Sequence, residues 1–266
     1  MDAPAEQDPP STRVALVSGV GDGIGRACAL ALAADGADLV LGARDGSRLE
    51  RIAHEVRALG RRAVVVPADV SDPDAVARLV AAGPDALGRL DVVVNVAARA
   101  GTNRPVEHLD AEDVRRSFEV NVLGTLEVSR RAVPHLRAAG CGSIVQISAL
   151  SAHTRLPGLA DYTSTKAAMV TASLTLAREV GRDGIRVNVV VPGYTTGEGL
   201  DRYLDSVAER RGTSRAEVEH EILRSSALRR FPEPGDIAEA VAWFASARSR
   251  AVTGQVLHVN AGEWIP

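Results

Sequence analysis

A tyrosine and a lysine four residues apart, Tyr162 and Lys166, have the types and spacing for acid/base chemistry. If the segment is helical, this spacing places the phenol and the ammonium side by side on one face. A cation beside a phenol favours the phenolate, so we expect the pKa of Tyr162 to fall from about 10 toward the working pH. Such a tyrosine can act as a general acid or base. Because the same spacing also occurs on ordinary surface helices, its interpretation depends on the rest of the chain.

A glycine-rich turn near the start of the chain supplies that context. Residues 13–17 form a short apolar run, as expected for a buried parallel strand, and apolar residues recur at helical spacing from residue 24 onward. Between them lies Ser18-Gly19-Val20-Gly21-Asp22-Gly23-Ile24-Gly25. Glycines let a backbone approach a pyrophosphate closely, and a helix N-terminus offers free N–H groups and a positive dipole end. Strand, glycine turn and helix in this order predict a dinucleotide site.

Strand and helix patterns alternate along the rest of the chain. Further strands are predicted at residues 38–43, 63–67, 91–95, 143–147, 186–191 and 256–259. Helical patterns follow them, including a helix capped by Ser71, a long helix over residues 111–136, and the helix with the tyrosine–lysine pair. The alternation predicts an α/β fold, with one doubly wound Rossmann-type domain over residues 13–266 and a seven-stranded parallel sheet flanked by helices.

Two segments depart from this alternation. Residues 194–234 carry no strand signal and show a helical pattern rich in Glu and Arg. Because they follow the sixth strand at the edge where open α/β sheets bind ligands, we expect a substrate lid, or alternatively a solvated helical excursion. Residues 1–12 are rich in proline and acidic residues and lack the features of a signal peptide. They are expected to form a disordered leader.

Composition narrows the range of functions. Hydrophobic residues make up 45% of the chain and charged residues 24%, as in an ordinary soluble globular protein. The net charge of -3 gives no reason to expect nucleic acid or an anionic membrane as a partner, and no apolar stretch is long enough to cross a bilayer. Cys28 and Cys141 lie far apart without metal-ligand spacing, so we expect no disulfide framework, no metal site and a cytoplasmic location.

Taken together, the motifs resemble the short-chain dehydrogenase/reductase family over residues 13–262. The resemblance is carried in order by the glycine turn, Asn95, Asn121, a serine after the fifth predicted strand, Tyr162-x-x-x-Lys166 and Pro192-Gly193. It implies an NAD(P)(H)-dependent oxidoreductase that interconverts a secondary alcohol and a ketone on a small or medium organic molecule. The cofactor supplies the hydride, and the protein supplies placement and a proton.

The resemblance also implies roles for individual residues. Tyr162 would exchange a proton with the substrate oxygen, Lys166 would lower the tyrosine pKa and hold the nicotinamide ribose, and Asn121 would anchor a water in the proton relay. Ser148 completes the implied catalytic set. The implied cofactor-binding residues are Ser18, Gly19, Gly21, Asp22, Gly23, Ile24, Gly25, Arg44, Asp69, Val70, Asn95, Ala97, Tyr162, Lys166, Pro192, Gly193 and Thr195.

The cofactor choice depends on the end of the second predicted strand. An acidic residue there would bind the ribose 2′-hydroxyl of NAD, but this chain has Ala43 followed by Arg44, which can stack on adenine and meet a 2′-phosphate. NADP(H) is therefore favoured and NAD(H) remains possible. Asp22 opposes this preference, because it lies where NADP-binding relatives often carry a base.

The chain departs from the family pattern at several positions. The serine that orients the substrate would lie thirteen residues before the tyrosine, where this chain has Ala149. Ser148 is one residue away and would point to the opposite face of a strand. Either a bulge or a one-residue difference in the loop brings Ser148 into the site, or Ser151 replaces it, or the site works without this hydrogen bond. Ala98 replaces a family glycine beside the cofactor, and Gly197 replaces a threonine, for which Thr195 and Thr196 can substitute.

These departures keep other functions open. A non-redox enzyme on the same scaffold, such as a dehydratase, isomerase or cyclase, would retain the nucleotide as a structural part. A 3-oxoacyl reductase would need a basic patch for a carrier protein, and a nucleotide-sensing protein would not need the tyrosine–lysine pair. By analogy with the family we expect a homotetramer or homodimer built on the long helices that carry Asn121 and Tyr162.

Overall fold

Seven parallel strands form one sheet at the centre of the structure, a computed structural model that describes residues 12–265. The strands are β1 (Val14–Ser18), β2 (Asp38–Ala43), β3 (Ala63–Pro67), β4 (Val92–Asn95), β5 (Gly142–Ile147), β6 (Ile185–Pro192) and β7 (Val256–Val259). Their order is β3-β2-β1-β4-β5-β6-β7. The predicted parallel, doubly wound sheet is confirmed. The predicted leader lies outside the described residues, apart from Thr12.

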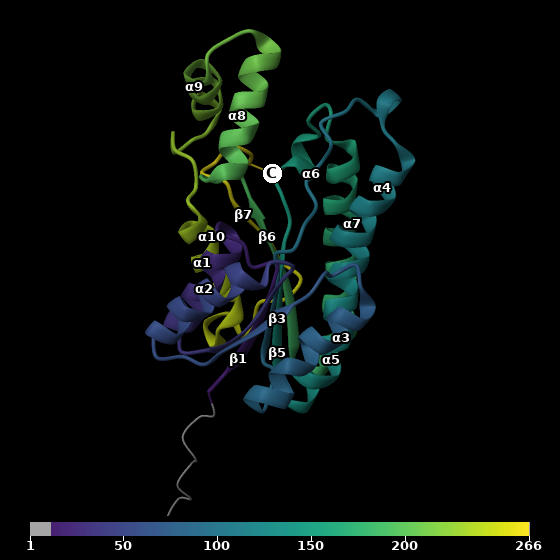
Figure 1. The fold of residues 1–266 in the computed structure, drawn as a ribbon, viewed down its shortest axis with the longest axis vertical. Coiled ribbons are helices and arrows are strands. Elements are labelled where there is room, and N and C mark those ends of the chain that lie inside the picture. The colour runs from purple at the N-terminus through teal and green to yellow at the C-terminus, as the bar shows by residue number, and fades with distance from the viewer. Residues whose placement is uncertain (1–11, 266) are drawn as a thin grey trace, which may run out of the picture.

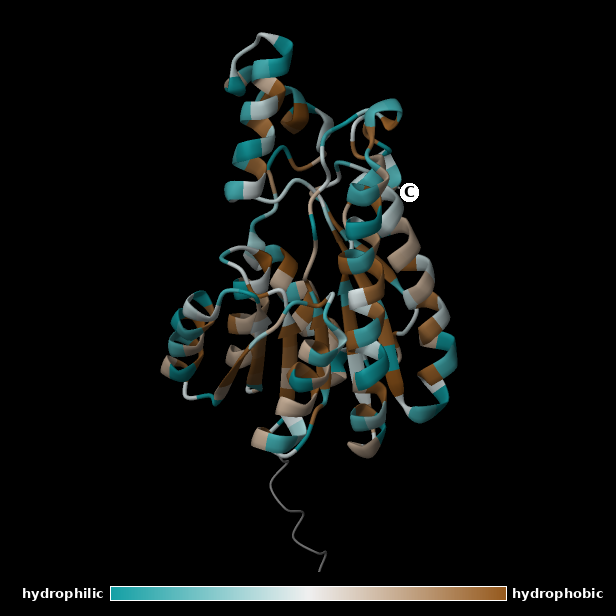
Figure 2. Ribbon diagram, turned by 45° about the vertical axis from the view of Figure 1, so that its right-hand side comes forward, coloured by the Kyte–Doolittle hydropathy of each residue, from teal (hydrophilic) through white to brown (hydrophobic). Residues whose placement is uncertain are grey.

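Helices cover both faces of this sheet (Figure 1). One layer holds α1 (Ile24–Ala34), α2 (Gly46–Ala58) and α10 (Pro234–Ala245), and the other holds α3 (Pro73–Ala82), α4 (Ala111–Phe118), α5 (Thr125–Ala138) and α7 (Ala160–Val180). Successive residues of β1 point into opposite layers, so that Ala15 packs with the first layer and Leu16 with the second. Figure 2 shows the consequence, which is hydrophobic strands between helices whose outer faces are hydrophilic. A strand buried on both faces has to read as a continuous apolar run.

The region predicted to be helical over residues 111–136 is helical throughout, but it is not one regular α-helix. A π-helical turn, Glu119–Gly124, separates α4 from α5 and contains Asn121. The predicted cap of the helix after β3 was wrong by one residue. Asp72 caps α3 by accepting a hydrogen bond from the N–H of Asp74 at 2.9 Å, whereas the Ser71 hydroxyl donates to Asp69.

Because all seven strands are parallel, their carboxyl ends share one edge of the sheet. The short helix α6 (Ser151–Thr154) follows β5 at this edge, and α8 (Glu198–Arg211) and α9 (Arg215–Ser225) rise beyond it after β6 (Figure 1). Apolar side chains of α8 and α9 pack on one another in a small separate cluster. The segment expected to form a lid is therefore helical and lies at the edge where ligands bind in such folds.

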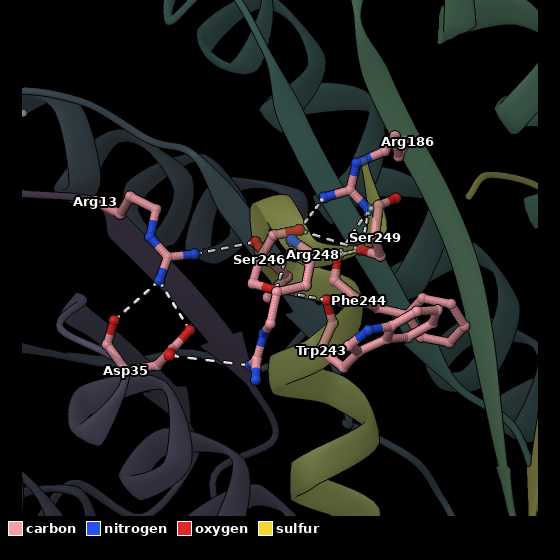
Figure 3. Close-up of polar contacts among 9 residues, drawn as sticks. Arg13, Asp35, Arg186, Trp243, Phe244, Ser246, Arg248 and Ser249 are labelled. Atoms are coloured by element: carbon pink, nitrogen blue, oxygen red, sulfur yellow. Dashed lines mark hydrogen bonds and ion pairs between the residues drawn. The ribbon is translucent and has the colours of Figure 1, made fainter. Parts of the chain in front are cut away.

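At the opposite edge, buried polar contacts anchor the end of α10 (Figure 3). The guanidinium of Arg186, on β6, donates to the backbone carbonyls of Phe244 at 2.8 Å, Ser246 at 3.2 Å and Ser249 at 3.2 Å. Arg13, just before β1, donates to the last carbonyl of α10 at 3.2 Å. The last carbonyls of a helix have no hydrogen-bond donor within the helix. At the end of α10, Arg186 and Arg13 act as those donors.

Candidate active site

The glycine turn between β1 and α1 combines two kinds of glycine. Gly19 has a φ of +84°, and a Cβ there would lie 2.2 Å from the backbone nitrogen of Ala97. A Cβ on Gly25 would lie 2.5 Å from the carbonyl oxygen of Gly19. Gly21 and Gly23, in contrast, have no atom within 4 Å of a Cβ position. The outer glycines are required by close packing, and the inner two leave open space above the first turn of α1.

The N-terminus of α1 faces that open space. Gly23 is the N-cap residue and has no side chain to accept a hydrogen bond from the first N–H groups, and the first turn contains no acidic residue. The free N–H groups and the positive end of the helix dipole therefore remain available to an anion. These features fit the pyrophosphate of a dinucleotide.

A groove of about 1200 Å³ extends from the glycine turn across the ends of β2 and β3. We call it the glycine-turn groove. It is lined by Gly19, Val20, Gly21, Ala43, Arg44, Asp45, Arg48, Ala68, Asp69, Val70, Ser71, Val96, Ala97, Ala98, Arg99, Ala100, Arg116, Glu119 and Val120. Six predicted cofactor residues are thus brought together from four different strand ends.

The charge of Asp22, beside this groove, is compensated in a way that the sequence did not predict. Its carboxylate pairs with Arg48, with Nε and Oδ2 3.1 Å apart, and also with Arg51. The hydrogen bond from Arg51 lowers the pKa of Asp22, so the carboxylate stays ionised and compensated. Asp22 does not line the groove, whereas Arg44 and Arg48 do. The expected repulsion of a phosphate by Asp22 is therefore offset by its arginine partners. Arg48 lies four residues after Arg44, in the first turn of α2, a position from which it could have been identified.

Ser18 and Asn95 lie beneath the groove rather than in its wall. The Ser18 hydroxyl donates to Oδ1 of Asn95 at 2.9 Å, and Nδ2 of Asn95 donates to the Ser129 hydroxyl at 3.2 Å. All three side chains are buried. They connect β1 and β4 to α5 and hold in place the backbone that forms the groove.

A second cavity, of about 620 Å³, contains the tyrosine–lysine pair. We call it the tyrosine cavity. It is lined by Ile24, Val96, Ala98, Ala100, Gly101, Asn103, Ile147, Ser148, Ala149, Leu150, Ser151, Thr154, Leu156, Leu159, Tyr162, Lys166, Pro192, Gly193, Tyr194, Thr195, Gly199, Leu200, Arg202, Tyr203 and Glu263. Val96, Ala98 and Ala100 also line the glycine-turn groove, so the two spaces meet along the segment after β4.

Tyr162 and Lys166 lie on α7, as their spacing predicts. Nζ of Lys166 lies 5.7 Å from the centroid of the Tyr162 ring and donates to the carbonyl oxygen of Ile147 at 2.9 Å. Burial raises the pKa of Tyr162 to about 12 and lowers the pKa of Lys166 to about 8. The expected lowering of the tyrosine pKa is thus wrong in direction for the protein alone, because burial disfavours the charged form of both groups.

Asn121 lies behind the pair and does not line either cavity. Its Nδ2 donates to the Thr165 hydroxyl at 2.9 Å and to the carbonyl oxygen of Arg99 at 3.1 Å, and its Oδ1 accepts from the N–H of Arg99 at 2.7 Å. The side chain therefore joins the loop after β4 to α7 next to Lys166. A π-helical turn of this kind is often found at functional sites.

The end of β5 bears on which serine can orient the substrate. The strand ends at Ile147, so the alternation of a strand does not decide the direction of the following side chains. Ser148, Ala149 and Ser151 all line the tyrosine cavity. The hydroxyls of Ser148 and Ser151 are buried and have no hydrogen-bond partner among the described residues. Both are thus free to bond a substrate oxygen.

The remaining predicted residues divide between the two spaces. Thr195 lines the tyrosine cavity together with Pro192 and Gly193, and its hydroxyl donates to the Gly193 carbonyl at 3.1 Å. The Asp69 carboxylate accepts hydrogen bonds from the N–H and hydroxyl of Ser71, and the hydroxyl bond lowers its pKa most. Predicted residues that line neither space are Ser18, Asp22, Gly23, Gly25, Asn95 and Asn121.

The outer part of the tyrosine cavity comes from residues that motifs do not mark. Leu200 and Tyr203 reach it from α8, and Tyr194 follows β6. The Tyr194 hydroxyl donates to the Tyr203 hydroxyl at 2.8 Å, which connects α8 to the end of the sheet. Glu263, in the segment after β7, also lines the cavity. The only sequence signal for Glu263 is its place just beyond the carboxyl end of a parallel strand.

None of the described helices has the length and apolar character needed to span a bilayer.

Sequence comparisons identify relatives along nearly the whole chain. A family model described as enoyl-(acyl carrier protein) reductase matches residues 19–263. An uncharacterized oxidoreductase of Methylorubrum extorquens is 38% identical over 253 residues, which cover 94% of this chain and 97% of the relative. A 3-oxoacyl-[acyl-carrier-protein] reductase of Staphylococcus aureus is 31% identical over 257 residues, covering 96% of this chain and 99% of the relative.

Among solved structures of the same architecture, one contains NAD⁺ and another contains NADPH. An NAD⁺-bound xylitol dehydrogenase superimposes with a TM-score of 0.90 at 27% identity and covers 96% of this chain and 100% of its own. The L-sorbose reductase of Gluconobacter frateurii, in complex with NADPH and L-sorbose, gives a TM-score of 0.88 at 29% identity, with 95% and 97% covered. The two neighbours differ in cofactor while sharing the fold.

Proposed function

This chain belongs to the short-chain dehydrogenase/reductase family, and we propose that it reduces a ketone to a secondary alcohol with NADPH. Membership confirms the resemblance drawn from the motifs and makes the protein an oxidoreductase that acts on CH–OH and C=O groups with a nicotinamide cofactor. The observation that carries the proposal is the meeting of two spaces along Val96, Ala98 and Ala100. One space is suited to a dinucleotide, and the other contains Tyr162 and Lys166.

The residues present fit such a cofactor. The glycine turn and the N-terminus of α1 would hold its pyrophosphate, Arg44 and Asp69 its adenosine end, and Pro192 and Gly193 its nicotinamide. When bound, the cofactor supplies a hydride for the substrate carbon.

Tyr162 would supply the proton. A phenol whose pKa lies near 12 is protonated at neutral pH, which suits a donor to the oxygen of a ketone undergoing reduction. Lys166, with its pKa near 8, is mostly protonated at neutral pH. Its positive charge lies beside the phenol as that proton leaves. The free hydroxyls of Ser148 and Ser151 would orient the carbonyl oxygen.

The preference for NADPH rests on two arginines at one end of the glycine-turn groove. Arg44 is exposed after β2, and Arg48 lies one turn into α2. A guanidinium can bind a 2′-phosphate with two parallel hydrogen bonds, and no carboxylate follows β2 directly to bind a ribose 2′-hydroxyl. Asp45 is engaged instead in capping α2 by accepting from the N–H of Arg48 at 3.1 Å.

A fluorescence titration with NADPH and NADH, followed by a ketone panel, tests the proposal. We expect tighter binding of NADPH, consumption of NADPH with at least one ketone, and a loss of about 10²–10⁴-fold in kcat/KM for Tyr162→Phe. Retained NADPH binding in the variant would show that the loss is one of chemistry. Undiminished turnover in Tyr162→Phe would contradict the role of Tyr162. Substrate conversion without NADPH consumption would instead favour the non-redox alternative, a dehydratase, isomerase or cyclase.

A 3-oxoacyl reductase is the second candidate, favoured by the acyl-carrier-protein names of the matching family and of the Staphylococcus relative. Turnover of a 3-oxoacyl thioester at a higher kcat/KM than free ketones would support it. The mouth of the tyrosine cavity offers a carrier protein one basic lining residue, Arg202, which pairs with Glu198 at 3.4 Å. This limited basic surface is why we place free ketones first.

The proposal extends to the arrangement around the site. We propose one catalytic domain over residues 13–266 in which α8 and α9 act as the substrate lid, since Leu200 and Tyr203 line the tyrosine cavity. We also propose a homodimer or homotetramer in the cytoplasm, formed through α5 and α7. Leu123, between α4 and α5, is 59% exposed beside a shallow groove of about 810 Å³ on these helices. Light scattering would report the assembly, and a monomer at micromolar concentration would contradict it.

A further inference from the structure

Glu263 is the one carboxylate among the described residues that line the tyrosine cavity. It follows the turn after β7, and its Oε2 lies 2.9 Å from the position that a Cβ on Gly193 would take. Gly193 itself follows β6, in the turn that we assign to the nicotinamide. The absence of a side chain at Gly193 thus makes room for the carboxylate in the wall of the cavity.

The Glu263 carboxylate has few partners. Oε2 accepts one hydrogen bond, from the N–H of Tyr194 at 3.3 Å, and Oε1 accepts none from the part of the chain that the structure describes. The carboxylate forms no ion pair with an arginine, lysine or histidine in the part of the chain that the structure describes, and burial raises its pKa. A partly buried carboxylate without a cation is costly unless another donor compensates it.

The cations that line the same cavity are engaged elsewhere. Nζ of Lys166 donates to the carbonyl oxygen of Ile147, and Arg202 is exposed at the mouth, where it pairs with Glu198. The rest of the outer wall is mostly apolar, with Leu156, Leu159 and Leu200 among its residues. Glu263 is therefore an acceptor that lines ligand space, and its Oε1 has no donor among the described residues.

We propose that Glu263 accepts a hydrogen bond from a hydroxyl or ammonium group of the substrate, so that the site selects ketones bearing such a donor over plain ketones and oxo acids. A negative charge attracts an ammonium, accepts from a hydroxyl and repels a carboxylate. A site that provides a polar partner for one group also discriminates against analogues that lack it. This inference rests on the proposed ketone reduction.

A matched series of cyclic ketones tests the inference on the full-length protein with NADPH. The series comprises cyclohexanone, its 2-, 3- and 4-hydroxy derivatives, 4-aminocyclohexanone and 4-oxocyclohexanecarboxylate. We expect kcat/KM for at least one hydroxyketone and for the aminoketone to exceed that for cyclohexanone by about tenfold or more, and the oxo acid to fall below it. Glu263→Met should bring these ratios close to one. Glu263→Gln should keep the hydroxyl preference, because its amide oxygen still accepts, and lose the response to charge.

Glu209→Gln, which removes an exposed carboxylate from α8, is the matched control and should keep the wild-type ratios. Wild-type ratios in Glu263→Met would overturn the inference. So would a rise in the Kd for NADPH that matches the loss in kcat/KM for every ketone, because Glu263 would then hold the cofactor. Turnover of cyclohexanone without any preference for a donor overturns the inference and leaves the proposed function intact. If the wild type consumes NADPH with none of these ketones nor with a wider ketone panel, the proposed function fails and the inference with it.

Discussion

The two edges of the sheet treat buried polar groups differently. At the amino edge, Arg186 and Arg13 donate to the carbonyls that end α10, and the Ser249 hydroxyl accepts from Arg186 at 2.7 Å (Figure 3). At the carboxyl edge, the hydroxyls of Ser148 and Ser151 are buried without partners among the described residues. Buried polar groups are normally satisfied, so groups left free need an explanation. The contacts at the amino edge stabilise the fold, whereas these two hydroxyls at the carboxyl edge remain available to a ligand.

The sharpest test of this contrast separates the two serines. Ser148→Ala and Ser151→Ala should each leave the melting temperature almost unchanged, because neither removes a hydrogen bond within the protein. Replacement of whichever serine orients the carbonyl should lower kcat by about 10²–10³-fold. Kinetics of both variants with the best ketone, beside thermal melts, provide the measurement. Ser143→Ala is the control, since its hydroxyl donates to the Phe244 carbonyl at 2.9 Å at the other edge. Full activity in both serine variants would show that the free hydroxyls have no role.

The amino edge should respond in the opposite way. Arg186→Met removes the charge-assisted hydrogen bonds to three carbonyls and to the Ser249 hydroxyl at the end of α10, and should reduce the free energy of unfolding by about 3 kcal/mol. kcat/KM measured well below the melting temperature should stay near the wild-type value, because Arg186 lies at the edge away from the site. Urea unfolding of this variant, with Arg182→Met as an exposed control, measures the effect. A loss of activity without a loss of stability would contradict the division between the edges.

At the carboxyl edge, Arg44→Ala should weaken NADPH binding about 10- to 100-fold and affect NADH much less, since a charge-assisted hydrogen bond to the 2′-phosphate is lost. Fluorescence titrations with both cofactors give the ratio of the two dissociation constants. Arg57→Ala, near the far end of α2, removes the same charge away from the groove and should not change this ratio. Equal weakening of NADPH and NADH binding would mean that Arg44 stacks on adenine without contacting the 2′-phosphate.

The smallest expected effect concerns two histidines near the carboxyl edge. The rings of His153 and His258 lie 4.8 Å apart, and each lies 4.7 Å from the ring of Trp264. Burial lowers both pKa values, with Arg155 adding to the effect on His153 and His153 to that on His258. Below about pH 6.5 the unfolded chain therefore binds protons that the folded chain does not yet bind.

The contribution of these two histidines to stability should accordingly be fully present above about pH 6.5 and should be lost as the pH falls below it. Thermal melts from pH 7.5 to 5 would show a smaller decline in His258→Gln than in the wild type. His220→Gln, on the exposed face of α9, should follow the wild-type curve. An identical slope in His258→Gln and the wild type would show that this cluster does not contribute to the pH dependence.

Much of the fold was predictable because its signals are local. Apolar runs identified all seven strands, since a parallel strand covered on both faces must be apolar throughout. The glycine turn and the spacing of Tyr162 and Lys166 are likewise set by neighbouring residues. The π-helical turn at Asn121 was not predicted, because α4 continues through it into α5 without a proline or glycine at the start of the turn.

Contacts between distant segments decided what the sequence left open. The tyrosine pKa depends on burial beneath other elements, the neutralisation of Asp22 depends on arginines of α2, and the direction of Ser148 depends on where β5 ends. Glu263 belongs to the site only because the ends of β6 and β7 lie side by side. The sequence by itself determined which elements form and in what order, because periodicity is local. Tertiary structure alone decided which polar groups face the cavity and with what charge, because desolvation and ion pairing depend on residues far away in the chain.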